Sequence, residues 1–311
     1  MCSKKTKKIL LSGGSGMVGL NFRESSISNH FELISPSRKE MNLLDYHSTY
    51  EFVKDIKPWM VIHSAGKVGG IKANMDDHFN FYSENIVMGN NILLASRNLG
   101  IKKLINLGSS CMYPSSIKNP LKEDLLFSGS LEPTNEGYAL AKIAVAKLSE
   151  YISKSGKDLN YKTIIPCNLY GKYDKFDLEN SHLIPAAMLK IHKAKERNES
   201  KIEMWGDGSA KREFMYIKDF IDFLNYAIVN FDNLPQFINV GTEKDYSIKE
   251  YYRLISKIVG FKGNIIKDLD KPTGMIRKKV STSLQKKFGW KSRINLKTGL
   301  KQTYEFFLEN Y

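Results

Sequence analysis

Cysteine is scarce in this sequence, and long apolar runs are missing. Three of the 311 residues are cysteine, at Cys2, Cys111 and Cys167, and no regular spacing relates them. A disulfide framework or a zinc site needs more cysteines at regular intervals, so we expect neither a disulfide nor a metal. A run of about 18 apolar residues, the length of a membrane span, does not occur either. The basic start leads into a short apolar run that ends in glycines, unlike a signal peptide. We therefore expect a cytoplasmic protein with no membrane partner.

Acidic residues are fewer than basic ones. Lysine and arginine number 47 and aspartate and glutamate 33, for a net charge of +14. Such an excess is compatible with nucleic-acid binding. Because the lysines are scattered along the chain, we interpret most of the excess as solvated surface, with some of it facing an anionic substrate. We therefore expect no nucleic-acid partner.

The first half of the chain alternates short apolar runs with longer helical stretches. The expected strands are 8–12, 31–35, 59–63, 103–107 and 161–165, and the expected helices are 16–26, 46–56, 76–98 and 136–154. This alternation predicts an α/β fold, a Rossmann-like doubly wound parallel sheet with helices on both faces. Ligands bind such sheets at the carboxyl ends of the strands.

The pattern loosens after residue 170. The expected helices are 182–197, 217–230, 247–259 and 296–309, with short strands at 202–205 and 236–240. We predict a first domain at 1–170 and a smaller C-terminal α/β lobe at 171–311, allowing that the chain crosses back to the sheet.

A glycine-rich loop joins the first expected strand to the first helix. Gly13 permits a tight turn, Gly16 lets the backbone approach a diphosphate, and Gly19 lets the helix pack closely. An ordinary glycine-rich turn is the alternative, but the position between strand and helix favours a dinucleotide cofactor. We expect cofactor contacts from Gly13, Gly14, Ser15, Gly16, Met17, Val18 and Gly19.

The end of the second strand indicates which nicotinamide cofactor is bound. An acidic residue there would hold a free ribose 2′-hydroxyl. Residues 35–39 carry no acid, and Arg38 is suited to pair with a 2′-phosphate. We predict NADPH rather than NADH, with residues 1–170 as the NADP-binding domain.

Tyr138 and Lys142 are four residues apart on an expected helix, so they share one face. A nearby ammonium favours the phenolate, so we expect Lys142 to move the pKa of Tyr138 toward working pH. The pair alone also occurs by chance on amphipathic helices. Ser109, just after the fourth strand, is placed to share a substrate carbonyl with Tyr138. A dinucleotide sensor without chemistry would not need all three residues.

These motifs together resemble the extended short-chain dehydrogenase/reductases, and further stretches are similar to the GDP-L-fucose synthase family within them. The stretches are 65–71, 108–114, 131–136, 168–171, 180–182, 212–214 and 271–272. The resemblance implies NADPH-dependent reduction at C4 of a GDP-4-keto-6-deoxy sugar, with 3,5-epimerisation in the same site. It also implies a homodimer, formed through helices 76–98 and 136–154.

The resemblance assigns a role to each candidate site residue. Tyr138 protonates the C4 oxygen, Ser109 hydrogen-bonds it, and Lys142 binds the nicotinamide ribose and tunes Tyr138. Cys111 and His182 are the base and acid of epimerisation; without the resemblance, Cys111 reads as a small buried residue and His182 as a helix residue without a special role. Further cofactor contacts are Leu107, Gly108, Pro166, Asn168 and Leu169, and substrate contacts are Asn168, Lys190, Trp205 and Arg212. Trp205 is also compatible with plain core.

Several positions depart from the family pattern. Ser15 replaces an arginine in the glycine loop, which leaves the NADP preference to Arg38, and Gly137 is expected to loosen the approach of Tyr138. Thr273 and Ile276 replace an acid and a lysine in the substrate lobe. These changes leave an alternative open, a C4 reductase without epimerase activity that acts on a related GDP-sugar such as GDP-4-keto-6-deoxy-heptose.

Overall fold

The structure, a computed structural model, describes residues 7–272 and 274–311. Cys2 and Thr273 lie outside the described residues. Within these ranges, no helix has both the length and the apolar character needed to cross a membrane.

Six parallel strands form the central sheet, in the order β2-β1-β3-β4-β5-β9. In β1, three successive residues are fully buried, Ile9, Leu10 and Leu11. Such burial is expected where helices cover both faces of a sheet. The predicted Rossmann-like sheet is confirmed. Its strands are β1 (Lys8–Ser12), β2 (Glu32–Ile34), β3 (Met60–His63), β4 (Lys103–Leu107), β5 (Asn160–Pro166) and β9 (Phe237–Val240).

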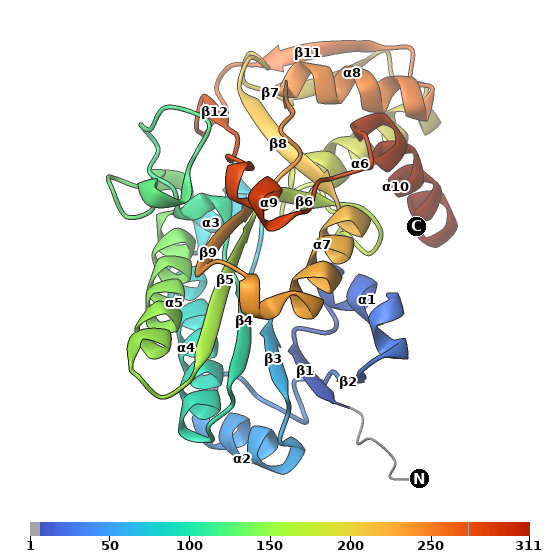
Figure 1. The fold of residues 1–311 in the computed structure, drawn as a ribbon. Coiled ribbons are helices and arrows are strands. Elements are labelled where there is room, and N and C mark those ends of the chain that lie inside the picture. The colour runs from blue at the N-terminus through green and yellow to red at the C-terminus, as the bar shows by residue number, and fades with distance from the viewer. Residues whose placement is uncertain (1–6, 273) are drawn as a thin grey trace.

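Helices cover both faces of this sheet (Figure 1). Three of them, α2, α4 and α5, lie on one face, and α1 and α7 lie on the other. The helix expected at 76–98 is α4, which begins two residues later, at His78, because the Asp77 carboxylate accepts the Asn80 amide and caps it; the short helix α3 precedes it. The helices are α1 (Met17–Arg23), α2 (Tyr46–Ile56), α3 (Ile71–Asp76), α4 (His78–Asn98), α5 (Glu136–Lys154) and α7 (Ile217–Val229).

The strand expected at 236–240 belongs to the central sheet and not to the C-terminal lobe. Phe237 pairs with Thr163 of β5, and Ile238 and Val240 are fully buried. The chain therefore crosses back to the sheet after α7. The domain division at residue 170 remains a prediction.

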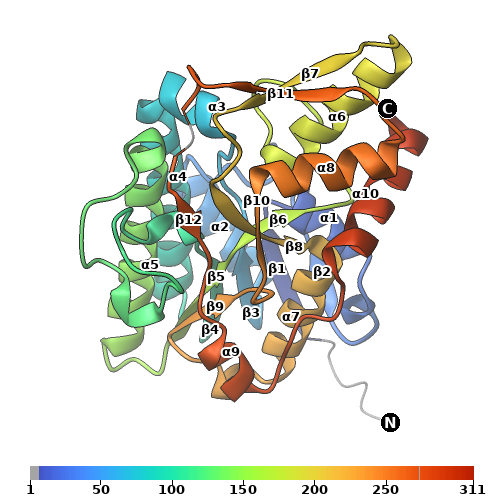
Figure 2. The same cartoon turned by 90° about the horizontal axis from the view of Figure 1, so that it is seen from above.

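The lobe sits over the carboxyl ends of the sheet strands (Figures 1 and 2). It holds one small sheet in the order β10-β8-β12, with β6 also paired to β8, and a second sheet of β11 and β7. Its elements are β6 (Asn168–Tyr170), α6 (Leu183–Glu196), β7 (Lys201–Trp205), β8 (Lys211–Tyr216), β10 (Asp245–Ser247), α8 (Ile248–Val259), β11 (Asn264–Asp268), β12 (Arg277–Lys278), α9 (Ser283–Phe288) and α10 (Leu296–Asn310).

One continuous core joins this lobe to the sheet. Ile165 of β5, Ile184 of α6 and Phe220 of α7 belong to the same buried cluster. Because apolar burial stabilises in proportion to the area removed from water, this shared core fixes the lobe on the sheet.

Candidate active site

A cleft of about 1060 Å³ lies between the lobe and the carboxyl ends of the sheet strands. Open α/β sheets bind their ligands at this edge. Its walls come from the loops after β1, β3 and β4, the start of α5, the β5–β6 junction, and the lobe. Every residue predicted for the site lines the cleft except Gly19, which packs behind the glycine loop.

The glycine loop is held in close contact with its surroundings. Gly13 has φ +78°, and a Cβ there would lie 2.6 Å from the Ala65 nitrogen; at Gly19 a Cβ would lie 2.3 Å from the Gly13 oxygen. At Gly16 the protein comes no nearer than 3.5 Å. The room at Gly16 fits its predicted role, because there the backbone faces the cleft instead of other protein.

The groups beside the loop fit a dinucleotide. Ser35 Oγ lies 1.5 Å from where a Gly14 Cβ would be, and it is buried without a hydrogen-bond partner in the described residues. Arg38 lines the cleft nearby, while the nearest acid, Glu40, accepts the Ser37 amide at 2.7 Å. A guanidinium in the cleft with no acid beside it suits the phosphate of a phosphorylated ribose.

Tyr138 stands in the first turn of α5, with its ring edge-on to Phe81 at 6.5 Å. Burial raises the pKa of Tyr138 well above its ordinary value, and the negative charge that Cys111 can carry raises it further, while a hydrogen bond with Ser109 lowers it. The phenol is therefore protonated at neutral pH, the state that a proton donor needs.

Lys142 does not act on Tyr138 as expected. Its Nζ donates to the Leu107 carbonyl at 2.9 Å and lies 5.8 Å from the centre of the Tyr138 ring. Burial lowers the pKa of Lys142 to about 8. The expectation that this ammonium brings the pKa of Tyr138 toward neutrality is wrong, because burial raises that pKa and outweighs a charge at that distance.

Cys111 follows β4 in a short 3-10 turn, Ser110–Met112. Its amide donates to Ser109 Oγ at 3.2 Å, which ties the thiol to the hydroxyl that faces Tyr138. Its sulfur accepts from Asn135 Nδ2 at 3.4 Å and from Lys278 Nζ at 3.3 Å. The sulfur is thus surrounded by donors from two further elements.

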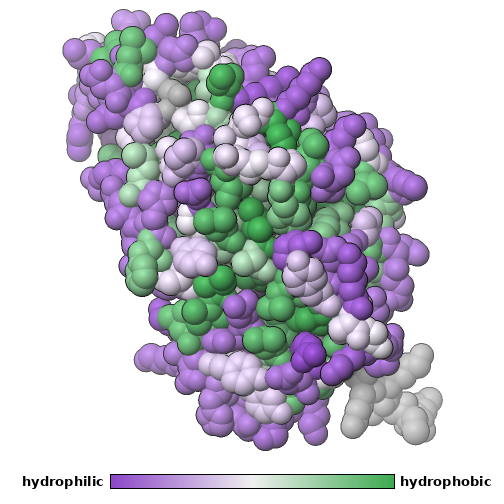
Figure 3. All heavy atoms as spheres, turned by 90° about the vertical axis from the view of Figure 1, so that its left-hand side faces the viewer, coloured by the Kyte–Doolittle hydropathy of each residue, from purple (hydrophilic) through white to green (hydrophobic). Residues whose placement is uncertain are grey.

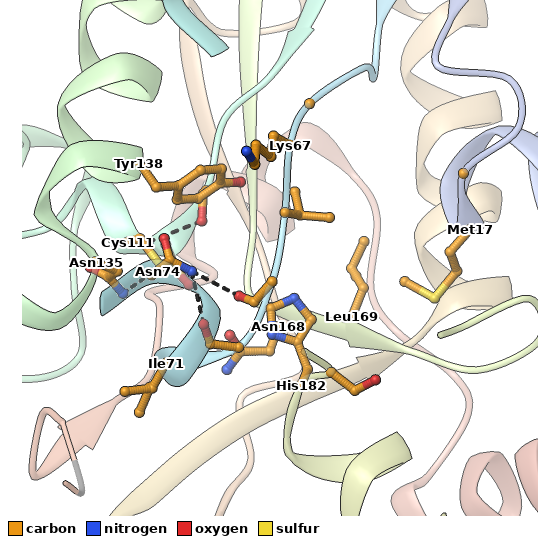
Figure 4. Close-up of a pocket in the computed structure, with 18 of the residues that line it drawn as sticks. Met17, Lys67, Ile71, Asn74, Cys111, Asn135, Tyr138, Asn168, Leu169 and His182 are labelled. Atoms are coloured by element: carbon orange, nitrogen blue, oxygen red, sulfur yellow. Dashed lines mark hydrogen bonds between the residues drawn. The ribbon is translucent and has the colours of Figure 1, made fainter. Parts of the chain in front are cut away.

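His182 precedes α6 and faces the same part of the cleft. Figure 4 shows Tyr138, Cys111, His182 and Asn168 around one centre, with Met17 at the glycine-loop end. Burial, together with the smaller effect of the Lys278 charge, lowers the pKa of His182 to about 4. The imidazole is therefore neutral at pH 7 and must take up a proton before it can deliver one.

The predicted substrate residues lie on the lobe side of the cleft. Lys190 Nζ donates to the Glu203 carbonyl at 3.0 Å, and Asn168 Nδ2 donates to the Glu213 carbonyl at 3.0 Å. Arg212 donates to the carbonyls of Lys211 and Met275. Trp205 is half-buried at the cleft rather than in the core. Two cations and an indole on one wall suit a nucleoside diphosphate.

Gly137 brings helices together and does not loosen them. A Cβ at this position would lie 2.6 Å from the His78 carbonyl at the start of α4. Any side chain would therefore push the first turn of α5, and Tyr138 with it, away from α4. The expected loosening is wrong.

The two side chains that contact the Cys111 sulfur, Asn135 and Lys278, were not among the predicted site residues. Asn135 lies in a stretch that resembles the family, but its bond to Cys111 cannot be read from that stretch. Lys278 lies on a strand of two residues and meets Cys111 from 167 positions away in the chain. Only the folded lobe brings this lysine to the cleft.

Known proteins match this chain along nearly its whole length. The model of the NAD dependent epimerase/dehydratase family matches residues 9–241. The GDP-L-colitose synthase of Yersinia pseudotuberculosis is 51% identical over 301 residues, which cover 97% of this chain and 98% of that protein. The GDP-L-fucose synthase of Azorhizobium caulinodans is 40% identical over 304 residues, covering 98% and 97%.

A solved structure agrees with these relatives. It is MlghC, a GDP-mannoheptose C4 reductase from Campylobacter jejuni with NADP bound, with a TM-score of 0.87, 33% identity, and coverage of 98% of this chain and 99% of that one. The match extends over the cleft and both of its walls. The chain therefore belongs to the NAD dependent epimerase/dehydratase family, among the extended short-chain dehydrogenase/reductases that include the GDP-L-fucose synthases.

Proposed function

We propose that this protein reduces C4 of a GDP-4-keto-6-deoxy sugar with NADPH and epimerises C3 and C5 in the same cleft. One observation carries the proposal: Ser109, Tyr138 and Cys111 meet at one point of the cleft, with Lys142 behind them and a cationic wall opposite. The relatives named above are synthases and a reductase of GDP-linked sugars, which supports this substrate class.

NADP is the cofactor, as the sequence predicts, and the related reductase MlghC holds it. When bound, NADPH supplies the hydride for C4. In this chain the loop 13–18 would hold the diphosphate, Arg38 would pair with the 2′-phosphate, and Lys142 would bind the nicotinamide ribose. The cleft is also lined by four other residues that the resemblance assigns to the cofactor: Leu107, Gly108, Pro166 and Leu169.

The reduction needs a proton at the C4 oxygen. Tyr138, protonated because it is buried, donates that proton, and Ser109 holds the same oxygen by a hydrogen bond. Lys142, fixed on the Leu107 carbonyl, keeps a positive charge behind them that stabilises the phenolate left after the transfer. These residues together place acid and hydrogen-bond donor on one oxygen.

The epimerisation needs a base and an acid beside the same ketone. Protons next to C4 become removable when the enolate oxygen is stabilised, and Tyr138 and Ser109 are placed to do this. Cys111 and His182 flank the centre (Figure 4) and exchange protons at C3 and C5.

The alternative is a C4 reductase without epimerase activity, and the similarity to MlghC supports it. NADPH oxidation is assayed with a panel of 4-keto sugars linked to GDP, dTDP or UDP. The sugars have six or seven carbons, and each is tested with and without a C3 hydroxyl. The keto sugars are also incubated in deuterated water without NADPH. We expect turnover of GDP-sugars and deuterium at C3 or C5. Turnover without deuterium would leave the alternative, and no turnover of any GDP-sugar would reject both.

Arg38→Ala is expected to raise the Michaelis constant for NADPH by about tenfold to a hundredfold, the loss of one charge-assisted pair, and to leave that for NADH unchanged. The reason is that Arg38 lines the cleft beside Ser35 with no acid facing it in the segment 35–39. Steady-state kinetics with both cofactors measures this, with the adjacent Lys39→Ala as control. Equal Michaelis constants for the two cofactors in the parent protein would contradict the assignment.

We also propose a homodimer built on α4 and α5, in the cytoplasm. Large apolar side chains are exposed on these helices: Phe79 at 76%, Tyr82 at 42%, Leu140 at 42% and Tyr151 at 60%. Apolar residues gather on this face in Figure 3. Contiguous exposed apolar surface of this kind indicates an interface, and a two-fold dimer would cover it with the same surface of a second copy.

The cytoplasm is supported by the absence of a disulfide framework in the sequence.

The dimer is tested by sedimentation velocity. We expect twice the 35.5 kDa of one chain, and a monomer when Leu140 is replaced by glutamate. Leu308, exposed at 55% on α10, provides the control, because Leu308→Glu should leave the dimer intact. A monomeric parent protein would reject the proposal.

A further inference from the structure

Lys278 is a buried lysine without a carboxylate partner. It is 9% exposed on β12, and within the described part of the chain its ammonium forms no ion pair. Its Nζ donates a hydrogen bond to Cys111 Sγ at 3.3 Å. Burying an ammonium is unfavourable unless an opposite charge or a good acceptor faces it. A neutral thiol is a weak acceptor, so the placement of Lys278 calls for a stronger one.

The sulfur of Cys111 receives two donors at once. Asn135 Nδ2 points at it from 3.4 Å, in addition to Lys278. A thiol would itself donate a proton, whereas a thiolate only accepts. Two donors, one of them charged, therefore match the thiolate form of Cys111.

The register of the lobe sheet brings a second cation close. Lys278 pairs directly with Arg212 across β12 and β8. Burial lowers the pKa of Arg212, and the negative charge available at Cys111 opposes this shift. A thiolate at Cys111 would therefore lie near two cations of the lobe, Lys278 and Arg212, and both would stabilise its charge.

We propose that Lys278 is the positioning residue that holds Cys111 as a thiolate and so makes Cys111 the base of epimerisation. The catalytic half of this inference rests on the proposed function. The thiolate half does not, because it is argued from the contacts of the sulfur alone.

Epimerisation by the thiolate is an exchange of protons at C3 or C5. The thiolate takes a proton from C3 or C5, an S–H bond forms, and the C–H electron pair moves into the enolate, whose charge rests on the C4 oxygen. Tyr138 and Ser109 hold that oxygen. Reprotonation at carbon from the opposite side uses a proton that His182 has taken up from solvent, and the electron pair returns to carbon. The Cys111 thiol then releases its proton to solvent, which restores the thiolate and leaves the net proton count unchanged.

Lys278 also separates the roles of the two proton carriers. Its charge favours an anion at Cys111 and disfavours a cation at His182, where burial and this charge together lower the pKa to about 4. The resting site therefore holds a charged base and a neutral imidazole. The titratable and charged groups around the sulfur are Lys278 of β12, Arg212 of β8, Tyr138 of α5, His182 before α6 and Glu132.

The test of the thiolate uses iodoacetamide and needs no substrate. The rate of Cys111 alkylation is followed by peptide mass spectrometry across pH in the full-length protein, in Lys278→Met and in Lys279→Met. Lys279 is the matched control, because it neighbours Lys278 and acts on Asp245 and Glu243 instead of Cys111. We expect Lys278→Met to slow alkylation at neutral pH by about tenfold or more, the effect of losing one adjacent opposite charge. The difference should vanish at alkaline pH, where any thiol ionises.

The same variants are then tested for chemistry. Deuterium uptake from solvent at C3 and C5 of GDP-4-keto-6-deoxy-mannose, without NADPH, should fall in Lys278→Met, recover partly in Lys278→Arg, and persist in Lys279→Met. Thermal melting confirms that each variant is folded.

Two results overturn the inference and can be told apart. An alkylation profile that Lys278→Met leaves unchanged rejects the thiolate, whatever the enzyme does. In the other result, Lys278→Met slows alkylation as expected but the parent protein takes up no deuterium at C3 or C5. That result rejects the epimerase part of the proposed function, and with it the catalytic role of the thiolate.

Discussion

Tyr138→Phe is expected to lower the rate of NADPH-dependent reduction by about 10²- to 10⁴-fold, the usual contribution of a general acid. The change removes one oxygen, the proton donor to C4. The ring and its edge-on contact with Phe81 remain, as does the bond from Lys142 to the Leu107 carbonyl. The loss should therefore appear in kcat, with the affinity for NADPH nearly unchanged.

The measurement is steady-state NADPH oxidation with the best sugar of the panel, together with NADPH binding by fluorescence. Tyr151→Phe is the matched control, since Tyr151 lies on the same helix and is 60% exposed. A kcat for Tyr138→Phe within a few-fold of the parent value would remove the phenol from the mechanism. A large loss in both variants would point to damage of α5 instead.

The sequence predicts best those features that are encoded locally. The glycine loop, the apolar strands and the Tyr138–Lys142 spacing each depend on residues within a few positions of one another. The structure places them at the cleft as expected. These signals are strong because a tight turn needs glycine and a helix puts every fourth residue on one face.

Features that depend on tertiary packing were not predictable in this way. The direction of the Tyr138 pKa shift follows from burial, which the sequence does not show. Strand β9 reads like any short apolar run, and its place beside β5 depends on how α7 packs. Lys278 has no motif, because its function depends on meeting Cys111 across the cleft.

Gly13→Ala is expected to lower kcat/KM for NADPH by about 10²-fold, the effect of displacing a positioning group by about 1 Å. At φ +78° the new Cβ would lie 2.6 Å from the Ala65 nitrogen and 2.7 Å from its Cα. These are backbone atoms next to β3, so no rotation of a side chain relieves the clash. The loop must move away from the sheet, and its amides move with it. Cofactor titration and thermal melting measure the two consequences.

Gly100→Ala separates the clash from the backbone strain. Gly100 has φ +69°, close to that of Gly13, but no atom lies within 4 Å of its added Cβ. An alanine in this left-handed conformation costs about 1–2 kcal/mol, so Gly100→Ala should lower the melting temperature by a few degrees and leave NADPH binding unchanged. Gly13→Ala carries the same strain and the clash in addition. If both variants bind NADPH equally well, the loop does not depend on its contact with Ala65, and the cradle that it forms for the diphosphate is not rigid.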